Sequence, residues 1–196
     1  MHFRVTTSPA LEPVTRAEAK IVARIEDAFT DHDTYIDSLI LGARKQAEDS
    51  TKRALITQTV TAHLDGFPRS NSIELPLPEL QSVASVKYYD SNNSLTTLSA
   101  SEYQVVGTKT PGKIELNDGV SWPTTYKKDH AVEIIYVAGY GDNPADVPED
   151  IRLAIMALVT HQYDHPGIVE TAPGIVSVAV PLSFDAVMRK YRIAYF

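Results

Sequence analysis

The chain has 196 residues, 43% hydrophobic and 22% charged, so it can bury a core and fits one domain with a large insertion. It contains no cysteine, which excludes disulfides, thiolate metal sites and a cysteine nucleophile. A net charge of -7 and a pI near 5.3 argue against a protein that grips a phosphate backbone. No apolar stretch reaches the roughly 20 residues of a membrane-spanning helix, and the N-terminus lacks a signal-peptide core, so we expect a soluble protein that is not exported.

Two helices are predicted near the N-terminus. Thr15 and Glu18 have the spacing of a capping box, in which each side chain accepts a hydrogen bond from the backbone of the other residue. This signal predicts a helix at about 16–25. A second helix, at about 34–53, follows a start signal at Asp31, because its apolar residues recur at helical spacing. Its apolar stripe narrows from Ile and Leu to Ala, which favours close packing against a neighbouring element.

The middle of the chain, residues 55–147, has the composition of loops and strands. It holds half of the prolines and most of the net negative charge, with 6 basic and 11 acidic residues. Short runs rich in β-branched residues alternate there with turn residues, which predicts five or six short antiparallel strands in a sheet or barrel-like module. The predicted strands are 56–64, 72–75, 83–90, 102–106, 113–116 and 131–137.

Helical patterning returns at about 148–164, where Pro148 is expected at the first helical position. The run 151–159 is apolar nearly all the way round. Such a helix is buried on several sides, either within the protomer or across a subunit contact. A loop is expected at 166–181, followed by a last helix at about 184–191.

Together these elements predict an α+β fold. Four helices form a helical bundle, and the β-rich segment is inserted between the second and the third helix. The chain then counts as one structural domain with an insertion. Its parts are the N-terminal helices (1–54), the β-rich insertion (55–147) and the C-terminal helices with the tail (148–196).

Two imidazoles, His161 and His165, are four residues apart on one helix face and have the spacing of metal ligands. In the His-Glu-x-x-His motif of zincins, the residue after the first histidine is the general-base glutamate. This chain has Gln162 there, so the zincin mechanism lacks its proton acceptor. Because Pro166 ends the helix, imidazoles that suit the negative end of the helix dipole are the favoured interpretation. A metal-dependent hydrolase that uses His161, Asp164 and His165 is the alternative.

The remaining motifs assemble no catalytic site. Gly139-Tyr140-Gly141-Asp142 follows a predicted strand, but it lacks the lysine of a P-loop and the third glycine of a dinucleotide fingerprint. No Gly-x-Ser-x-Gly elbow occurs, and no neighbourhood combines a nucleophile, a base and an electrophile stabiliser. We therefore predict that the protein is not an enzyme and has no catalytic residue, cofactor or metal ligand.

Several short phrases occur in a fixed order over nearly the whole chain. They are Glu12-Pro13-Val14-Thr15, Thr51-Lys52-Arg53-Ala54-Leu55, Leu64-Asp65-Gly66-Phe67-Pro68, Leu75-Pro76-Leu77-Pro78, Ser121-Trp122-Pro123, Val137-Ala138-Gly139-Tyr140-Gly141 and Val147-Pro148. By the number and order of these segments, the chain resembles the head–tail connector (adaptor) proteins of tailed phages, prophages and gene transfer agents. The family fold, a helical bundle with a β-rich insertion, agrees with the partition derived from composition.

The resemblance implies a non-enzymatic protein that forms a ring, usually dodecameric, under the capsid portal. Such a ring extends the DNA channel, lets double-stranded DNA pass without sequence-specific binding, and offers a platform to a neck, stopper or tail-terminator protein. It also implies a location at the head–tail junction of a virion or virion-like particle, synthesis in the bacterial cytoplasm, and no membrane partner. An acidic chain suits a conduit, because a channel lined with Lys and Arg would hold passing phosphates.

Two groups of apolar residues are the candidate partner or subunit contacts, because a cyclic ring needs two different complementary faces on each copy. The first group is Ile151, Ile155 and Leu158, and the second is Tyr191, Ile193, Tyr195 and Phe196. The second group forms an aromatic chain end that either docks on a partner such as the portal or folds back on the protomer's own core.

A stopper or tail-completion protein of the neck is a further interpretation of the same chain. Stoppers are usually mostly β, whereas good helices bracket the insertion here, so the adaptor interpretation is favoured.

Overall fold

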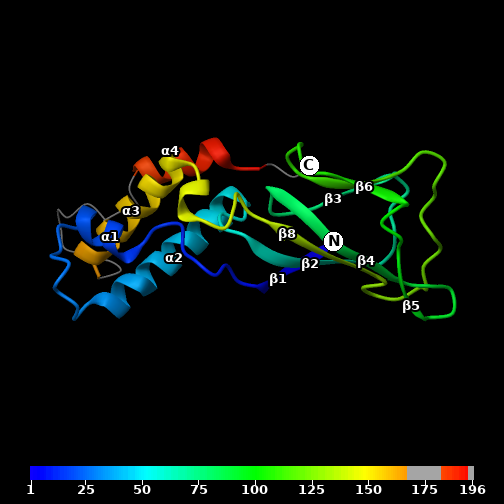
Figure 1. Ribbon diagram of the computed structural model, residues 1–196, viewed down its shortest axis with the longest axis horizontal. Coiled ribbons are helices and arrows are strands. Elements are labelled where there is room, and N and C mark those ends of the chain that lie inside the picture. The colour runs from blue at the N-terminus through cyan, green and yellow to red at the C-terminus, as the bar shows by residue number, and fades with distance from the viewer. Residues whose placement is uncertain (167–181, 194–196) are drawn as a thin grey trace, which may run out of the picture. The chain divides into compact units, whose positions relative to one another are not determined.

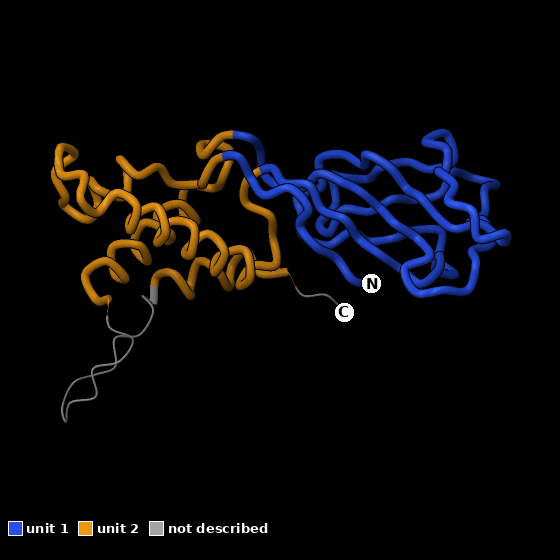
Figure 2. Tube along the Cα trace, turned by 90° about the horizontal axis from the view of Figure 1, so that it is seen from below, with its two compact units in different colours: residues 1–10, 57–142 blue, residues 11–56, 143–196 orange. Residues whose placement is uncertain are grey.

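The computed structural model describes residues 1–166 and 182–193, and contacts within the chain divide it into two compact units (Figure 2). Unit 1 consists of Met1–Ala10 and Thr57–Asp142, and unit 2 consists of Leu11–Ile56 and Asn143–Phe196. Within the described residues there are four α-helices and eight strands in two antiparallel sheets, which confirms the α+β class. Most of the predicted loop at 166–181 lies outside the described residues.

Unit 1 contains the strands of both sheets (Figure 1). The five-stranded sheet has the order β1-β2-β8-β4-β5, and the three-stranded sheet has the order β3-β7-β6. The bounds are β1 His2–Thr7, β2 Gln58–Leu64, β3 Ser72–Glu74, β4 Leu80–Tyr89, β5 Leu95–Thr97, β6 Tyr103–Val106, β7 Lys113–Leu116 and β8 Val132–Ala138.

The central strand β8 explains how the core of unit 1 forms. Every second residue of β8 is buried, as expected for a strand with one face on a core. Its Ile134 pairs with Ala62 of β2 and Val86 of β4, so three buried apolar residues lie in one row across the sheet. The three-stranded sheet contributes the buried Ile73 and Ile114, and β6 contacts β4. The two sheets therefore share one apolar core.

All six predicted strands occur, with ends shifted by up to three residues, and two further strands were not predicted. β1 was missed although Phe3 and Val5 alternate with polar residues; all six of its side chains are exposed, so neither of its faces is buried. Its pairing with β2, from His2 opposite His63 to Thr7 opposite Thr59, holds it in the sheet. β5 has only three residues. Residues 1–10 therefore belong to the β-rich unit, whereas the sequence pattern grouped all of 1–54 with the helices.

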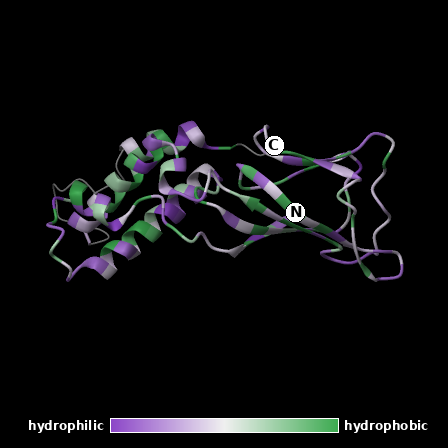
Figure 3. Ribbon diagram, viewed as in Figure 1, coloured by the Kyte–Doolittle hydropathy of each residue, from purple (hydrophilic) through white to green (hydrophobic). Residues whose placement is uncertain are grey.

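Unit 2 contains the four helices: α1 Arg16–Val22, α2 Asp33–Thr51, α3 Glu149–Asp164 and α4 Leu182–Tyr191, with a short 3-10 helix at Pro144–Asp146. α3 contacts each of the other three helices, and α2 also contacts α1 and α4. In Figure 3, α2 and α3 carry both hydrophobic and hydrophilic residues, as expected for helices with one face on a core. Within the described residues, no helix combines the length and the apolar character needed to cross a membrane.

The helix ends follow the predicted signals in part. The capping box is confirmed, because Thr15 accepts from the Glu18 amide at 3.2 Å and Glu18 accepts from the Thr15 amide at 2.8 Å. α1 is shorter than predicted: it ends at Val22, and Arg24 adopts a left-handed φ of 57° that breaks the helix. α3 begins one residue later than expected, with Pro148 as the N-cap.

Candidate functional site

The apolar residues of α3 form the centre of unit 2. Ile151, Ile155 and Leu158 are each 0% exposed, and α3 is surrounded by the other three helices. Of the two positions that the sequence allowed for them, the structure shows burial within the protomer. These side chains have no free surface in the isolated chain, whereas Leu153, the large apolar side chain that α3 leaves exposed, is 54% exposed.

The last described residues are held on unit 2 itself. Arg53 donates to the Tyr191 carbonyl oxygen at 2.7 Å, and the Ile193 amide donates to the Thr51 carbonyl oxygen at 3.0 Å. Tyr191 and Ile193, predicted as partner contacts, thus fold back onto the end of α2. The other two predicted contacts of the chain end, Tyr195 and Phe196, lie outside the described residues.

Asp150 fixes α4 to the first turn of α3. The Tyr191 hydroxyl donates to its two carboxylate oxygens at 2.8 and 3.0 Å, and Lys190 Nζ donates to one of them at 2.8 Å. Burial alone would raise the pKa of Asp150, but these hydrogen bonds outweigh it and keep the pKa below its ordinary value. The pKa of Lys190 is raised because its ammonium donates to Asp150.

His161 and His165 lie together at the end of α3, with ring centroids 5.1 Å apart. His165 Nδ1 lies 3.1 Å from the His161 carbonyl oxygen, so the hydrogen bond there requires a proton on Nδ1. Residues 1–166 and 182–193 contain no group of three or more His, Asp or Glu side chains that could hold a metal ion. The described residues therefore bring no third ligand to this pair.

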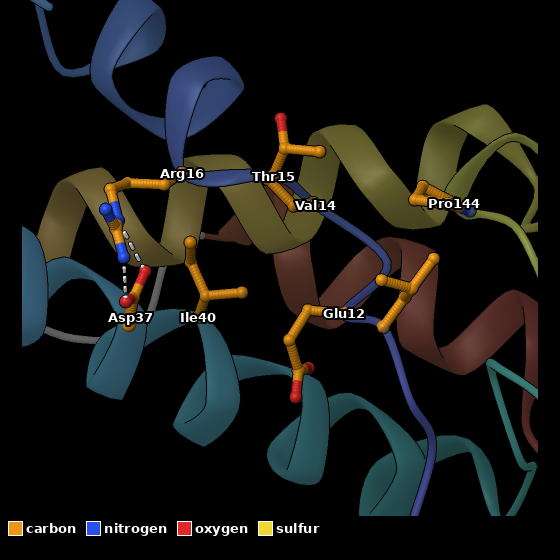
Figure 4. Close-up of a pocket in the computed structure, with 8 residues that line it drawn as sticks. Glu12, Val14, Thr15, Arg16, Asp37, Ile40 and Pro144 are labelled. Atoms are coloured by element: carbon orange, nitrogen blue, oxygen red, sulfur yellow. Dashed lines mark hydrogen bonds and ion pairs between the residues drawn. The ribbon is translucent and has the colours of Figure 1, made fainter.

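A groove of about 420 Å³ opens on unit 2, and most of its lining surface is apolar (Figure 4). It runs between the segment before α1 and the side of α2. The lining residues are Leu11, Glu12, Val14, Thr15, Arg16, Asp37, Ile40 and Pro144. Arg16 closes one end, where it donates through Nε to Asp37 at 2.8 Å and through a second nitrogen to Asp33 at 2.9 Å. Because Asp37 accepts a hydrogen bond from the guanidinium, the pKa of Arg16 is raised above its ordinary value.

Two buried arginines hold the wall of this groove in place. Arg44, 4% exposed, donates to Glu12 at 2.7 Å and to Glu48 at 2.6 Å. Arg152, 9% exposed, donates to the Pro13 carbonyl oxygen at 3.0 Å and also forms an ion pair with Glu18. The segment 11–18 is thus attached to α2 and α3 by charges instead of by a backbone ladder.

The ionised state of Glu18 supports this attachment. Burial alone would raise its pKa, but hydrogen bonds from Thr15 and the Arg152 guanidinium lower the pKa below the ordinary value. The carboxylates of the groove are likewise paired, Glu12 with Arg44 and Asp37 with Arg16. Because most of its lining surface is apolar, the groove offers an apolar contact surface.

Comparison with known proteins gives a likeness of fold. No family model and no curated protein matches the chain. Three solved chains match all of it and 97% of their own length. They come from the neck of an empty gene transfer agent (GTA) particle computed with C6 symmetry (TM-score 0.82, 21% identity), the virion of a native GTA particle (0.78, 21%) and the neck of a native GTA particle computed with C12 symmetry (0.71, 20%).

Both units of the chain are included in this likeness, because it covers the full length. At this level of identity it establishes the fold. The resemblance indicated by the sequence phrases is therefore confirmed as a shared fold with chains of GTA particles.

Proposed function

We propose that the chain is a non-enzymatic structural protein of the neck, a head–tail connector (adaptor) of a phage, a prophage or a gene transfer agent. The observation that carries this proposal is the full-length likeness to chains of GTA necks and virions. The protein is then made in the bacterial cytoplasm and resides at the head–tail junction of the particle.

The proposed assembly is a ring of twelve copies under the portal. The C6 and C12 symmetries of the related necks support a cyclic arrangement, in which each copy presents two different faces. The helices of unit 2 form the bundle that makes the ring body. Double-stranded DNA passes through the ring without sequence-specific binding, as suits a chain with a net charge of -7.

The proposed partners are the portal above the ring and a stopper or tail-terminator protein below it. Exposed apolar residues of unit 2 supply contact surface: Leu11 on the groove, Leu41 on α2 and Leu153 on α3 are 51%, 39% and 54% exposed. Since residues up to Ile193 are tied to α2, docking of the chain end on the portal falls to Tyr195 and Phe196.

Mixing the purified chain with its portal protein tests the proposed function. We expect portal-dependent assembly into a ring, visible in negative-stain class averages as an added layer below the portal. A chain that ignores the portal but binds a portal already carrying another ring protein is a stopper. A chain that binds neither contradicts a neck role.

Deleting residues 194–196 tests the docking of the chain end. This truncation leaves the hydrogen bond from Ile193 to Thr51 intact, so the fold of unit 2 is preserved. We expect weaker portal binding with an unchanged helical circular dichroism spectrum. Unchanged portal binding means that Tyr195 and Phe196 make no portal contact.

A further inference from the structure

The α1–α2 connection carries exposed charges without partners. Between residues 23 and 33 the sequence has four acidic residues and one arginine. Glu26, Asp27 and Asp31 are exposed, and the carboxylate of each has no ion pair or hydrogen bond with another described residue. We call these three residues, with Phe29 and Tyr35, the acidic end of unit 2.

Aromatic rings lie among these carboxylates. Phe29 meets His32 edge to face at 4.9 Å, and Tyr35 lies 6.0 Å from Tyr163 at the end of α3. His32 Nδ1 lies 2.6 Å from the Tyr163 hydroxyl oxygen, which links the rings into one cluster. Phe29 and Tyr35 are 39% and 41% exposed. Aromatic faces beside carboxylates attract guanidinium groups by cation–π and ionic attraction together.

The opposite end of α2 carries unpaired cations. A pocket of about 290 Å³ lies there, lined by Asp49, Ser50, Lys52, Asp185, Met188, Arg189 and Arg192. Lys52, Arg189 and Arg192 are exposed, and none has an ion-pair partner among the described residues. We call these three cations the basic end. Because Asp49 and Asp185 lie among them, the basic end is poorly suited to a phosphate backbone and better suited to a protein surface of mixed charge.

The two ends lie at opposite ends of one helix. α2 has 19 residues, which corresponds to a length of about 28 Å. The His32–Tyr163 contact is at its start, and the Thr51–Ile193 hydrogen bond is at its finish. Each end therefore belongs to the same packed unit, and neither can reach the other within one copy.

We infer that the acidic end of one copy binds the basic end of the next copy in the ring. Arg189 and Arg192 of one copy lie against Phe29 and Tyr35 of its neighbour and pair with its carboxylates. This head-to-tail contact is heterologous, so repetition closes a ring when the rotation allows it. The inference rests on the proposed function, because it states which surfaces join the copies of the proposed ring.

Charge reversal with exchange tests this contact. We expect Asp27→Lys/Asp31→Lys and Arg189→Glu/Arg192→Glu each to lower portal-templated ring formation roughly tenfold or more, since like charges then oppose each other. Combining all four substitutions in one chain restores attraction and, with it, ring formation. Asp118→Lys/Asp129→Lys is the matched control, because both carboxylates are exposed in unit 1 and neither has an ion pair or a side-chain hydrogen bond with a described residue. The control variant should form as many portal-templated rings as the wild type.

Disulfide trapping provides a direct second readout. The chain has no cysteine, so every thiol is an introduced one. Asp31→Cys/Arg192→Cys should give a ladder of covalent oligomers under oxidation in the assembled complex, and Glu74→Cys/Asp118→Cys should not.

The possible results separate the inference from the proposed function. If both charge-reversed variants form rings as the wild type does, and the cysteine variant gives no ladder of covalent oligomers, the inference is overturned while the proposed ring stands. If a charge-reversed variant no longer binds the portal, and the cysteine variant gives no ladder, the portal is the partner of that end. This result also overturns the inference. A wild-type chain that forms no ring overturns both.

Discussion

The two units of the chain differ in where they bury charge. In unit 1, the described core is made of apolar strand residues such as Ile134 and Ile114. Along the central strand β8, every second side chain is buried in this core. In unit 2, three cations are almost completely buried: Lys20, Arg44 and Arg152 are 3%, 4% and 9% exposed. The sheet unit therefore relies on apolar packing, whereas the helical unit also depends on ion pairs.

This difference follows from the segments that each unit must hold. The strands of unit 1 satisfy their backbone groups by pairing with one another. The segment 11–15 of unit 2 belongs to neither a helix nor a sheet, so side chains must hold it. Arg44 and Arg152 do so through Glu12, Glu18 and the Pro13 carbonyl oxygen. A buried cation is costly to leave unpaired, which makes unit 2 sensitive to the loss of single charges.

The largest effect is expected from Arg152→Ala. This substitution removes the donor to Pro13 and leaves Glu18 without its buried partner, and it should cost about 3 to 4 kcal/mol of the free energy of unfolding. The loss in the free energy of unfolding is measured by urea titration, with helical circular dichroism as the signal. The matched control is Arg16→Ala, whose side chain is 43% exposed and whose ion pairs should contribute less than about 1 kcal/mol. Equal losses in the two variants would contradict the special role of buried charge.

A pair of core truncations, Ile134→Ala in β8 and Ile155→Ala in α3, compares the units directly. Both side chains are 0% exposed, and each truncation should cost about 3 kcal/mol. Trp122 is the sole tryptophan and stacks on Phe67 in unit 1, with ring centroids 4.7 Å apart. The midpoint of urea unfolding measured by Trp122 fluorescence should fall more in Ile134→Ala. The midpoint measured by helical circular dichroism should fall more in Ile155→Ala. Identical shifts of both signals would mean that the units unfold as one.

A smaller effect is expected from Thr15→Ala, which removes the hydroxyl half of the capping box. Loss of an N-cap side chain typically costs about 1 kcal/mol. Thr15→Ser, which keeps the hydroxyl, is the control and should recover most of the loss. Thermal unfolding of both variants measures the difference, and a Ser variant as weak as the Ala variant would show that the methyl group matters instead.

The smallest effect concerns the pH dependence of unit 1. Burial and the neighbouring His130, stacked at 4.8 Å, lower the pKa of His63 below its ordinary value of 6.5. The unfolded chain then binds a proton more readily than the folded chain, so this contribution to stability is complete above pH 6.5 and declines as the pH falls below it. His63→Gln should flatten the Trp122-monitored stability profile in that window. An unchanged profile would show that His63 does not contribute to it.

Much of the fold could be predicted from local signals. The capping box of Thr15 and Glu18 and the periodicity of α2 gave the correct helices, because both depend on residues close in sequence. β1 was not predicted: Phe3 and Val5 alternate with polar residues, but the pattern covers only six residues. The strand is held by its pairing with β2, more than 50 residues away.

The site was less predictable than the fold. The apolar run of α3 suggested burial but could not distinguish an intramolecular core from a subunit contact, since both remove the same side chains from water. One signal was available for the buried ion pairs: Arg152 stands inside an otherwise apolar run, and such a cation needs a buried partner. Its partners Pro13 and Glu18 lie more than 130 residues away, so the sequence alone did not identify them.

The most direct test of a ring-forming neck protein is the mass of the complex that the chain forms with its portal, measured by multi-angle light scattering. The chain has a mass of 21.6 kDa, so a twelve-copy ring adds twelve times that value, about 260 kDa, to the mass of the portal. We predict a discrete added mass of this size. A portal whose mass is unchanged by excess chain would contradict the proposed function.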